Sequence, residues 1–319
     1  MKKFNEVDRH IWSDGVLIPW HEATVHVLSH SLQRGSLVFD YMSIKQTPLG
    51  EAIFRMDAHL RRLFRSCRLM GLALERDESE LAEAILETVR ANPGARVVKI
   101  SVLIPSVEID VVPRDSRVSV SIAAYDPVAD ILDRLPGEPV AKPDVLRLHL
   151  ERHKRQRRED IVSPEAKVSA NYVSSMMAKS KALEAGFHEI LLMDAEGFIA
   201  EGPTANIFIV TSDGFLRTPP EQRVLRGVTR ASVIALAEEM KIPCFEESIS
   251  PDELFAAEEA FMTGTSASIL PVESVDGYKM GTDCPGSVTV ALRERLIKIE
   301  RGEDPAFESW LTYVKEAPA

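Results

Sequence analysis

The sequence predicts an α+β protein of two domains, because strand and helix signals mix along its 319 residues and one proline- and glycine-rich span interrupts them. That length exceeds the size of most single domains. The interrupting span contains Asp126-Pro127, Pro136-Gly137 and Lys142-Pro143. We therefore expect a small N-terminal α/β domain of residues 1–125, a linker of residues 126–137, and a larger domain of residues 138–319.

Local patterns predict the elements of the small domain. Segments rich in β-branched and aliphatic residues predict strands at 16–18, 24–28, 37–44, 97–104 and 118–124. Asp57 is a candidate cap for a helix whose apolar residues recur at helical spacing up to Gly71. A second amphipathic helix is predicted from about Glu78 to Val89, before the turn residues Asn92-Pro93-Gly94.

The larger domain shows the same mixture, and we expect its sheet to be mixed or antiparallel and barrel-like. The patterns predict helices at about 170–185, 229–240 and 286–299, the first of them ended by Gly186. They predict strands at 206–211 and 259–262, and a hairpin that joins 189–193 to 198–200.

Composition excludes several classes of function. A hydrophobic content of 45% with a net charge of −11 is typical of a globular protein and argues against nucleic acid or an anionic membrane as the main partner. Without an apolar leader or spanning segment, and with three scattered cysteines, the chain is expected in the cytoplasm. His21, His26 and His30 fit no common zinc spacing, so we expect no metal site.

Lys167 and Glu201 are the candidate residues for covalent chemistry. A lone lysine is usually a solvated surface group, but small residues surround Lys167 and leave room for a planar ligand. An amine in a partly desolvated pocket can form a Schiff base with an aldehyde. Glu201 ends a predicted strand just before Gly202-Pro203, where a carboxylate is able to pair with the pyridine nitrogen of a cofactor.

Two short turns are candidate phosphate sites. Gly227-Val228-Thr229 stands immediately before a predicted helix, where free N–H groups and the helix dipole favour an anion. Gly264-Thr265-Ser266 follows a strand and offers N–H and hydroxyl donors. Simple helix capping explains each turn equally well when it is taken alone. Arg62 is a further candidate, although neighbouring arginines are also consistent with a solvated helix face.

Taken in order, these motifs resemble the fold-type IV aminotransferases, of which the D-amino acid and branched-chain aminotransferases are examples, over nearly the whole chain. The resemblance implies a pyridoxal 5'-phosphate (PLP) enzyme in which Lys167 is the Schiff-base lysine and Glu201 is the partner of the pyridine nitrogen. It also implies that Tyr172 binds the phenolic oxygen of the cofactor. The residues implied for the phosphate are Arg62, Val228, Thr229 and Thr265. A site between two domains and a homodimer are implied as well.

The substrate pocket is expected to involve Arg34, Phe39, Tyr41, Val98, Ile100, Thr204 and Ser266. Branched-chain enzymes typically receive substrate carboxylates on a Tyr-x-Arg strand motif, and the corresponding stretch here reads Val98-Lys99-Ile100. Strand alternation predicts that Lys99 points away from the pocket. Arg34, or the basic stretch 152–158, is then the expected replacement for the carboxylate clamp, with a solvated loop as the alternative for that stretch.

Three reactions remain open on the sequence alone. The first is transfer of an amino group from a hydrophobic, branched-chain-type amino acid to a 2-oxo acid. The second is the same chemistry on D-amino acids or (R)-amines, which Asp40, Tyr41 and the absent Tyr-x-Arg favour. The third is a PLP lyase of the aminodeoxychorismate lyase type.

Overall fold

The computed structural model describes residues 4–136, 143–153 and 160–314. Contacts divide this part of the chain into two compact units, one from the ranges 1–141, 166–170 and 299–319, the other from 142–165 and 171–298. The expected boundary assigns 166–170 and 299–319 to the large domain instead. The described residues of both segments make contacts in the first unit. Residues 166–170 bond to the backbone near Leu37, and Leu311–Tyr313 supplies a strand to that unit's sheet.

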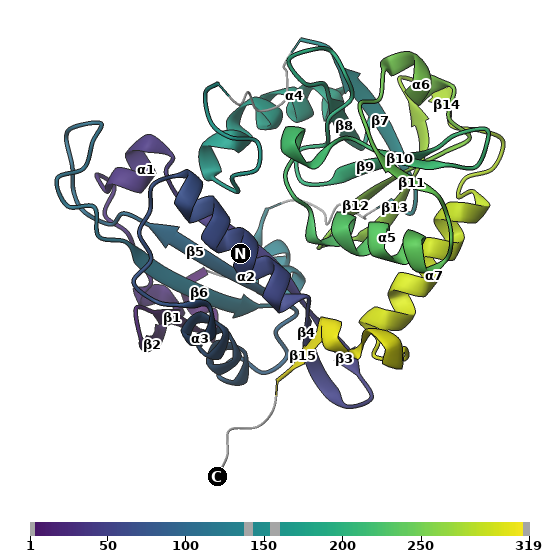
Figure 1. Ribbon diagram of the computed structural model, residues 1–319. Helices are drawn as coiled ribbons and strands as arrows, with labels where there is room; N and C mark the ends of the chain where they lie inside the picture. Colours follow the sequence, from purple (N-terminus) through teal and green to yellow (C-terminus); the bar gives the residue numbers. More distant parts are fainter. Residues whose placement is uncertain (1–3, 137–142, 154–159, 315–319) are drawn as a thin grey trace. The chain divides into compact units, whose positions relative to one another are not determined.

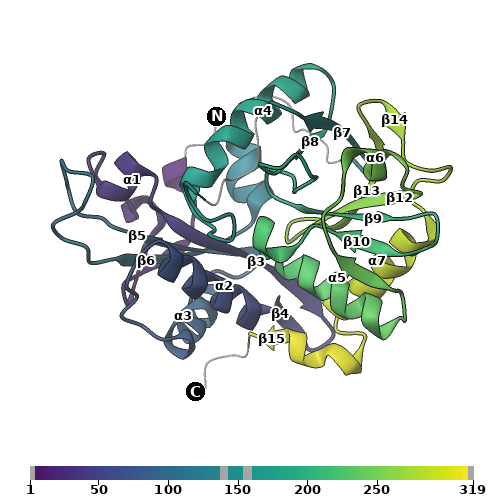
Figure 2. The same cartoon turned by 45° about the horizontal axis from the view of Figure 1, so that its top comes forward.

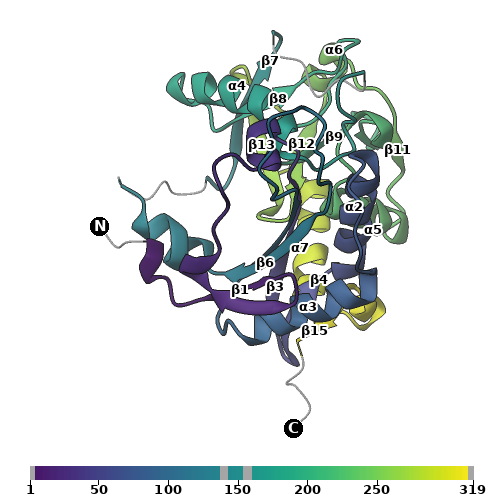
Figure 3. The same ribbon diagram turned by 90° about the vertical axis from the view of Figure 1, so that its left-hand side faces the viewer.

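The first unit is an antiparallel sheet with two helices packed on one face. Figure 1 and Figure 3 show α2 and α3 on the same side of this sheet, where α2 contacts β3 and α3 contacts β6. The described strands have the order β15-β4-β3-β5-β6-β1-β2. The helices are α1 (His30–Arg34), α2 (Met56–Leu69) and α3 (Glu78–Arg90); the strands are β1 (His10–Ser13), β2 (Val16–Pro19), β3 (Val38–Thr47), β4 (Gly50–Phe54), β5 (Val97–Leu103), β6 (Ser119–Tyr125) and β15 (Leu311–Tyr313).

Burial follows the alternation of the central strands. Val38, Met42, Val98 and Ile100 have no exposed surface, and they lie on the sheet face that α2 and α3 cover. Burying such side chains contributes roughly 1.5–3 kcal/mol each. The neighbouring odd-numbered residues point to the other face, which is only partly covered.

The second unit is a mixed sheet with the order β11-β10-β9-β12-β13-β7-β8, in which β7 runs parallel to both β8 and β13. Figure 2 shows α5 alongside β9 and β12, and α5 contacts β12. The strands are β7 (Leu146–Glu151), β8 (Glu189–Leu192), β9 (Asn206–Val210), β10 (Leu216–Thr218), β11 (Cys244–Glu246), β12 (Glu259–Gly264), β13 (Ser268–Val275) and β14 (Tyr278–Lys279); the helices are α4 (Val173–Glu184), α5 (Val228–Glu239), α6 (Pro251–Phe255) and α7 (Ser287–Glu300), the last two residues of α7 counting with the first unit.

Two local expectations were wrong. Residues 24–28 form no strand, and the apolar side chains of Val25, Val27 and Leu28 are exposed rather than packed in a sheet. Asp57 does not cap α2; it lies in the first turn, where its carboxylate pairs with Arg61 at 2.6 Å. Among the described residues, no helix has the length and apolar character needed to cross a membrane.

Candidate active site

Lys167 lies beside the start of β3. Val168 forms an antiparallel bridge with Val38, and the N–H of Phe39 donates to the carbonyl oxygen of Lys167 at 3.0 Å. This register places Lys167 opposite Phe39, on the same face of the sheet. The Lys167 Nζ therefore lies over the Phe39 ring, 4.8 Å from its centre. The backbone N–H of Lys167 donates to Ser66 Oγ on α2 at 3.0 Å, which fixes the segment from a second side.

Arg62 belongs to a buried charged network. Its Nε and one terminal nitrogen donate to the two oxygens of Asp40, each at 2.8 Å, and Asp40 has no exposed surface. His59 Nδ1 lies 2.7 Å from the same carboxylate. Burial alone would raise the pKa of Asp40, but Arg62 and His59 outweigh it and hold that pKa well below its usual range. Burial lowers the pKa of His59, against the opposing effect of Asp40.

Sequence reasoning missed Asp40 and His59 as partners of Arg62. The available signal was a single carboxylate inside the apolar strand Val38-Phe39-Asp40-Tyr41-Met42, facing a helix with histidine and arginine three residues apart. A buried carboxylate needs a cation close by, and residues three apart on a helix share one face.

The expected roles of Val98 and Ile100 are corrected by the register of β5. Both side chains are fully buried under the helices, so they offer no surface to a substrate. The Lys99 side chain, in contrast, points to the sheet face that the helices do not cover. Lys99 lies opposite Tyr41, and its Nζ is 4.9 Å from the centre of the Phe39 ring. Phe39, Tyr41 and Lys99 thus share the half-buried face on which the Lys167 amine lies.

Glu201 is a buried carboxylate of the second unit, only 2% exposed, and both of its oxygens accept hydrogen bonds. Asn206 Nδ2 donates to Oε2 at 2.8 Å, and the backbone N–H of Leu225 donates to Oε1 at 3.1 Å. Both carboxylate oxygens are thus held by donors from the protein. Asn206, which also donates to the Leu225 carbonyl at 3.0 Å, is a residue that sequence reasoning missed.

Gly227 connects this carboxylate to the expected phosphate turn. A Cβ at Gly227 would overlap Asn206 Oδ1, so only glycine fits beside the amide that holds Glu201. Gly227 is also the N-cap of α5, and its cap has no side-chain hydrogen bond. The N–H groups of the first turn, which begins with the buried residues Val228 and Thr229, are therefore free of a side-chain cap and suit a phosphate.

The second expected phosphate turn lies next to the Glu201 turn. The N–H of Ala267 donates to the carbonyl of Gly264 and closes a turn with Thr265 half-buried and Ser266 exposed. A Cβ at Gly264 would lie 3.3 Å from the carbonyl oxygen of Thr204, so the two turns are in close contact. The second unit thus brings together the turns that carry Glu201, Thr229 and Thr265.

The other expected residues are placed as follows. Tyr172 is half-buried and ends a 3₁₀ turn directly before α4. Arg34 is exposed at the end of α1, and its guanidinium donates to the carbonyl oxygen of Ile109 in the loop between β5 and β6 at 3.0 Å. Arg152 pairs with Asp276 at 2.7 Å, and residues 154–158 of the basic stretch lie outside the described residues.

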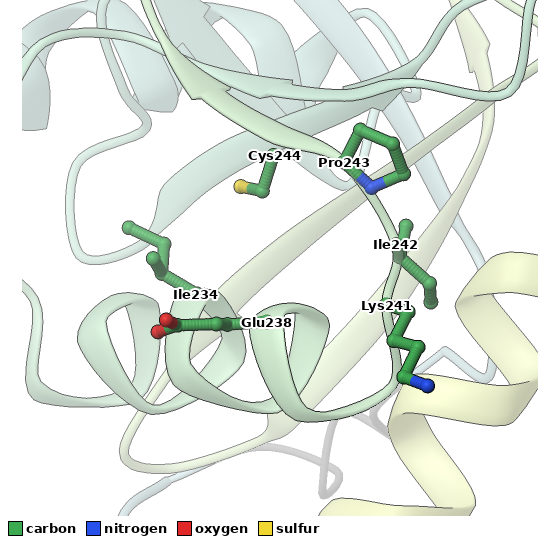
Figure 4. Close-up of a pocket in the computed structure, with 6 residues that line it drawn as sticks. All are labelled: Ile234, Glu238, Lys241, Ile242, Pro243 and Cys244. Carbon is green, nitrogen blue, oxygen red and sulfur yellow. The ribbon is translucent and has the colours of Figure 1, made fainter.

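A surface pocket on the second unit is separate from all of these groups. It has a volume of about 390 Å³ and is lined by residues of α5 and of the segment after it (Figure 4). Burial raises the pKa of its Cys244 thiol to about 11, which leaves the thiol protonated and a weak nucleophile. In the part of the chain that the structure describes, no three histidine, cysteine or acidic side chains gather as metal ligands would.

Comparison with known proteins decides the family. Residues 37–275 match the family model described as amino-transferase class IV. The chain belongs to the class IV aminotransferases. A branched-chain-amino-acid aminotransferase of Pseudomonas aeruginosa is 35% identical to this class IV aminotransferase over 96% of this chain and 97% of its own, and that of Escherichia coli K12 is 31% identical over 96% and 98%.

Solved structures agree with the sequence relatives. The branched-chain amino acid aminotransferase of Thermobaculum terrenum in its PLP form superposes with a TM-score of 0.85 at 29% identity, covering 97% of this chain and 99% of that one. The Escherichia coli enzyme gives a TM-score of 0.88 at 30% identity, covering 97% and 100%. The fold of this class IV aminotransferase is thus the α+β fold expected from its sequence.

Proposed function

We propose that this class IV aminotransferase uses PLP to move the amino group of a branched-chain amino acid to a 2-oxo acid. The observation that carries the proposal is the buried Glu201 carboxylate, held by Asn206 and Leu225 with both oxygens oriented. The full-length similarity to branched-chain-amino-acid aminotransferases supports the choice of substrate. PLP, when bound, supplies an aldehyde that accepts an amino group and a ring that withdraws electrons from the substrate's Cα.

The residues present fit this cofactor. The Lys167 amine lies beside a flat aromatic ring and is the group for the aldehyde carbon. Glu201 is proposed to bind the pyridine nitrogen and to keep its proton in place. The uncapped start of α5 at Val228 and Thr229, together with Thr265, offers N–H and hydroxyl donors suited to a phosphate. Arg62 is proposed for the same phosphate and Tyr172 for the phenolic oxygen.

Lys167 is also proposed to be the acid and base of the reaction. Once an amino donor has displaced it, its amine takes the proton from the substrate's Cα and delivers it to the C4′ carbon of the cofactor. Phe39 beneath the amine removes water from one side of it, and the Ser66 hydrogen bond keeps the main chain of Lys167 in register.

The decisive experiment follows the absorption of the purified, PLP-loaded protein during separate additions of L-leucine, D-alanine and (R)-1-phenylethylamine. We expect L-leucine alone to convert the band of lysine-bound PLP to that of pyridoxamine phosphate. Conversion by D-alanine or the (R)-amine in place of L-leucine would contradict the substrate class. Absence of any cofactor band after addition of PLP would contradict the assignment of Lys167.

We further propose that the enzyme is a homodimer. The loop between β5 and β6 carries exposed apolar side chains that a monomer leaves in water: Val107 (57% exposed), Ile109 (96%), Val111 (70%) and Val112 (74%). Light scattering coupled to gel filtration is expected to give twice the chain mass of 35.5 kDa. A mass of one chain at micromolar concentration would refute the dimer.

A further inference from the structure

A buried threonine hydroxyl of the second unit lacks a hydrogen-bond partner. Thr263 lies on β12 and is 1% exposed, and its Oγ1 makes no hydrogen bond to any described residue. Among the described residues of the second unit, no other buried side-chain nitrogen or oxygen atom is in this condition. Buried polar groups of native proteins are nearly always paired, because an unpaired one loses its hydration without compensation. The Thr263 hydroxyl therefore calls for a partner and a role.

Strand pairing places one polar side chain beside this hydroxyl. Thr263 lies directly opposite Asn206 on β9 and directly opposite Ile269 on β13. Opposite residues of antiparallel strands point to the same face of the sheet, with their Cβ atoms roughly 4.5–5.5 Å apart. The Ile269 side chain is apolar and offers no acceptor. The side-chain amide of Asn206 is therefore the polar group opposite Thr263, within reach of its hydroxyl directly or through one water.

The Asn206 amide has one atom to offer to a donor. Both hydrogens of its Nδ2 are used, at 2.8 Å from Glu201 Oε2 and at 3.0 Å from the carbonyl oxygen of Leu225. Its Oδ1 lies against Gly227, where a Cβ would be only 1.9 Å away. An amide turned by half a rotation would point Oδ1 at the oxygens of Glu201 and Leu225, which cannot donate. A donor at Oδ1 therefore holds the amide in the orientation that binds Glu201.

We propose that Thr263 is a positioning residue of the reaction, whose hydroxyl donates to Asn206 Oδ1, directly or through one water, and so orients the Glu201 carboxylate. This inference rests on the proposed function, since it takes Glu201 as the partner of the pyridine nitrogen. The hydroxyl holds the amide, and the amide holds Oε2 of the carboxylate. A charge-assisted hydrogen bond depends on its alignment, so loss of the hydroxyl weakens the contact of Glu201 with the cofactor while both charges stay in place.

The test measures the apparent dissociation constant of PLP in a cofactor titration without substrate. Thr263→Val keeps the shape of the side chain but removes the hydroxyl, and is expected to raise this constant about 3- to 10-fold. Thr263→Ser keeps the hydroxyl and is expected to stay within about twofold of the wild-type value. Thr88→Val makes the same change at a fully buried threonine of α3 in the first unit, where the hydroxyl donates to the Ala84 carbonyl at 2.6 Å. It is the matched control and should leave PLP binding unchanged.

A double variant separates positioning from packing. If Thr263 acts through Glu201, Thr263→Val should add less than about twofold to the PLP dissociation constant of Glu201→Gln, because the carboxylate that it orients is already absent. Four results overturn the proposal: an unchanged constant in Thr263→Val, an equal loss in Thr263→Ser, an equal loss in Thr88→Val, or the same loss with and without Glu201. Conversion of the wild-type protein by L-leucine is measured in parallel. Its failure contradicts the proposed substrate, whereas the PLP titration still decides the role of Thr263.

Discussion

Replacement of Asp40 by asparagine is the sharpest test of the buried network in the first unit. The Asp40 carboxylate has no exposed surface and accepts hydrogen bonds from Arg62 at 2.8 Å and from the N–H of Tyr41 at 2.7 Å. Asparagine has nearly the same shape but no charge. The change therefore leaves the Arg62 guanidinium, which is 7% exposed, as a buried cation that has lost the carboxylate facing it.

The size of the effect follows from this burial. Removing one partner of a buried ion pair costs about 3–5 kcal/mol, whereas breaking an exposed pair costs about 0–1 kcal/mol. For a domain of 150–250 residues, each kcal/mol shifts the melting temperature by about 2–4 °C, so we expect a loss of roughly 6–20 °C. Asp57→Asn breaks the pair with Arg61 on the same helix, where both side chains are more than half exposed, and is expected to shift the melting temperature by only a few degrees.

The assay is thermal unfolding at neutral pH, read by circular dichroism and repeated in urea. The double variant Asp40→Asn with Arg62→Met removes the buried cation as well and is expected to regain part of the loss. If Asp40→Asn and Asp57→Asn melt within about 2 °C of each other, the pair is not the buried charge interaction that its geometry indicates. A double variant less stable than Asp40→Asn would equally contradict the reasoning that a buried cation without its carboxylate is the source of the loss.

Three further outcomes follow from the same geometry. Burial holds the pKa of His59 below its usual 6.5, so below that pH the unfolded chain takes up a proton that the native protein does not. As the pH falls below 6.5, the wild-type protein should therefore lose up to about 1.4 kcal/mol of unfolding free energy per pH unit more than His59→Gln. Parallel profiles of unfolding free energy against pH, measured by urea titration, would contradict this. Gly227→Ala should weaken PLP binding about tenfold, because the new Cβ displaces the Asn206 amide from Glu201. An unchanged dissociation constant for PLP in a cofactor titration would refute this prediction. Glu201→Gln should still bind PLP but lower kcat with L-leucine at least about 100-fold, because an amide does not stabilise a protonated pyridine nitrogen. A kcat within about twofold of the wild-type value would show that Glu201 has no role in the reaction.

The central elements of the fold were predictable because their signals are local. Periodic apolar residues predicted α3 and α5, and β-branched runs predicted β3, β5 and β6 within a few residues. The short strand β15 was not predicted, since three residues carry no pattern and its partner β4 lies some 260 positions earlier in the chain. The strand predicted at residues 24–28 was wrong for the opposite reason. The alternation of apolar and polar residues is present, but no strand among the described residues pairs with this segment.

The sequence indicated single residues for the chemistry, and their roles stay predictions. The face of a strand that is open depends on strand pairing, and for β5 the sequence-based assignment of that face was wrong. For β5, a motif comparison placed Val98 and Ile100 in the pocket, although polar residues in the strand fall at Lys99 and Ser101. That alternation alone indicates which face is open, because a lysine on a helix-covered face needs a buried partner for its charge. Asn206 had a similar signal as the polar first residue of an otherwise apolar strand five residues after Glu201.

Helix α2 links the stability of the first unit to the position of its reactive amine. His59, Arg62 and Ser66 fall at positions three and four apart and so line one side of the helix. The first two hold Asp40 on β3, while Ser66 accepts the N–H of Lys167, about a hundred residues further along the chain. A shift of α2 along β3 would move both contacts together. The buried charges thus fix the helix in the register that keeps the Lys167 amine over Phe39. This positioning role explains the presence of a buried ion pair, which by itself contributes little net stability compared with an apolar pair.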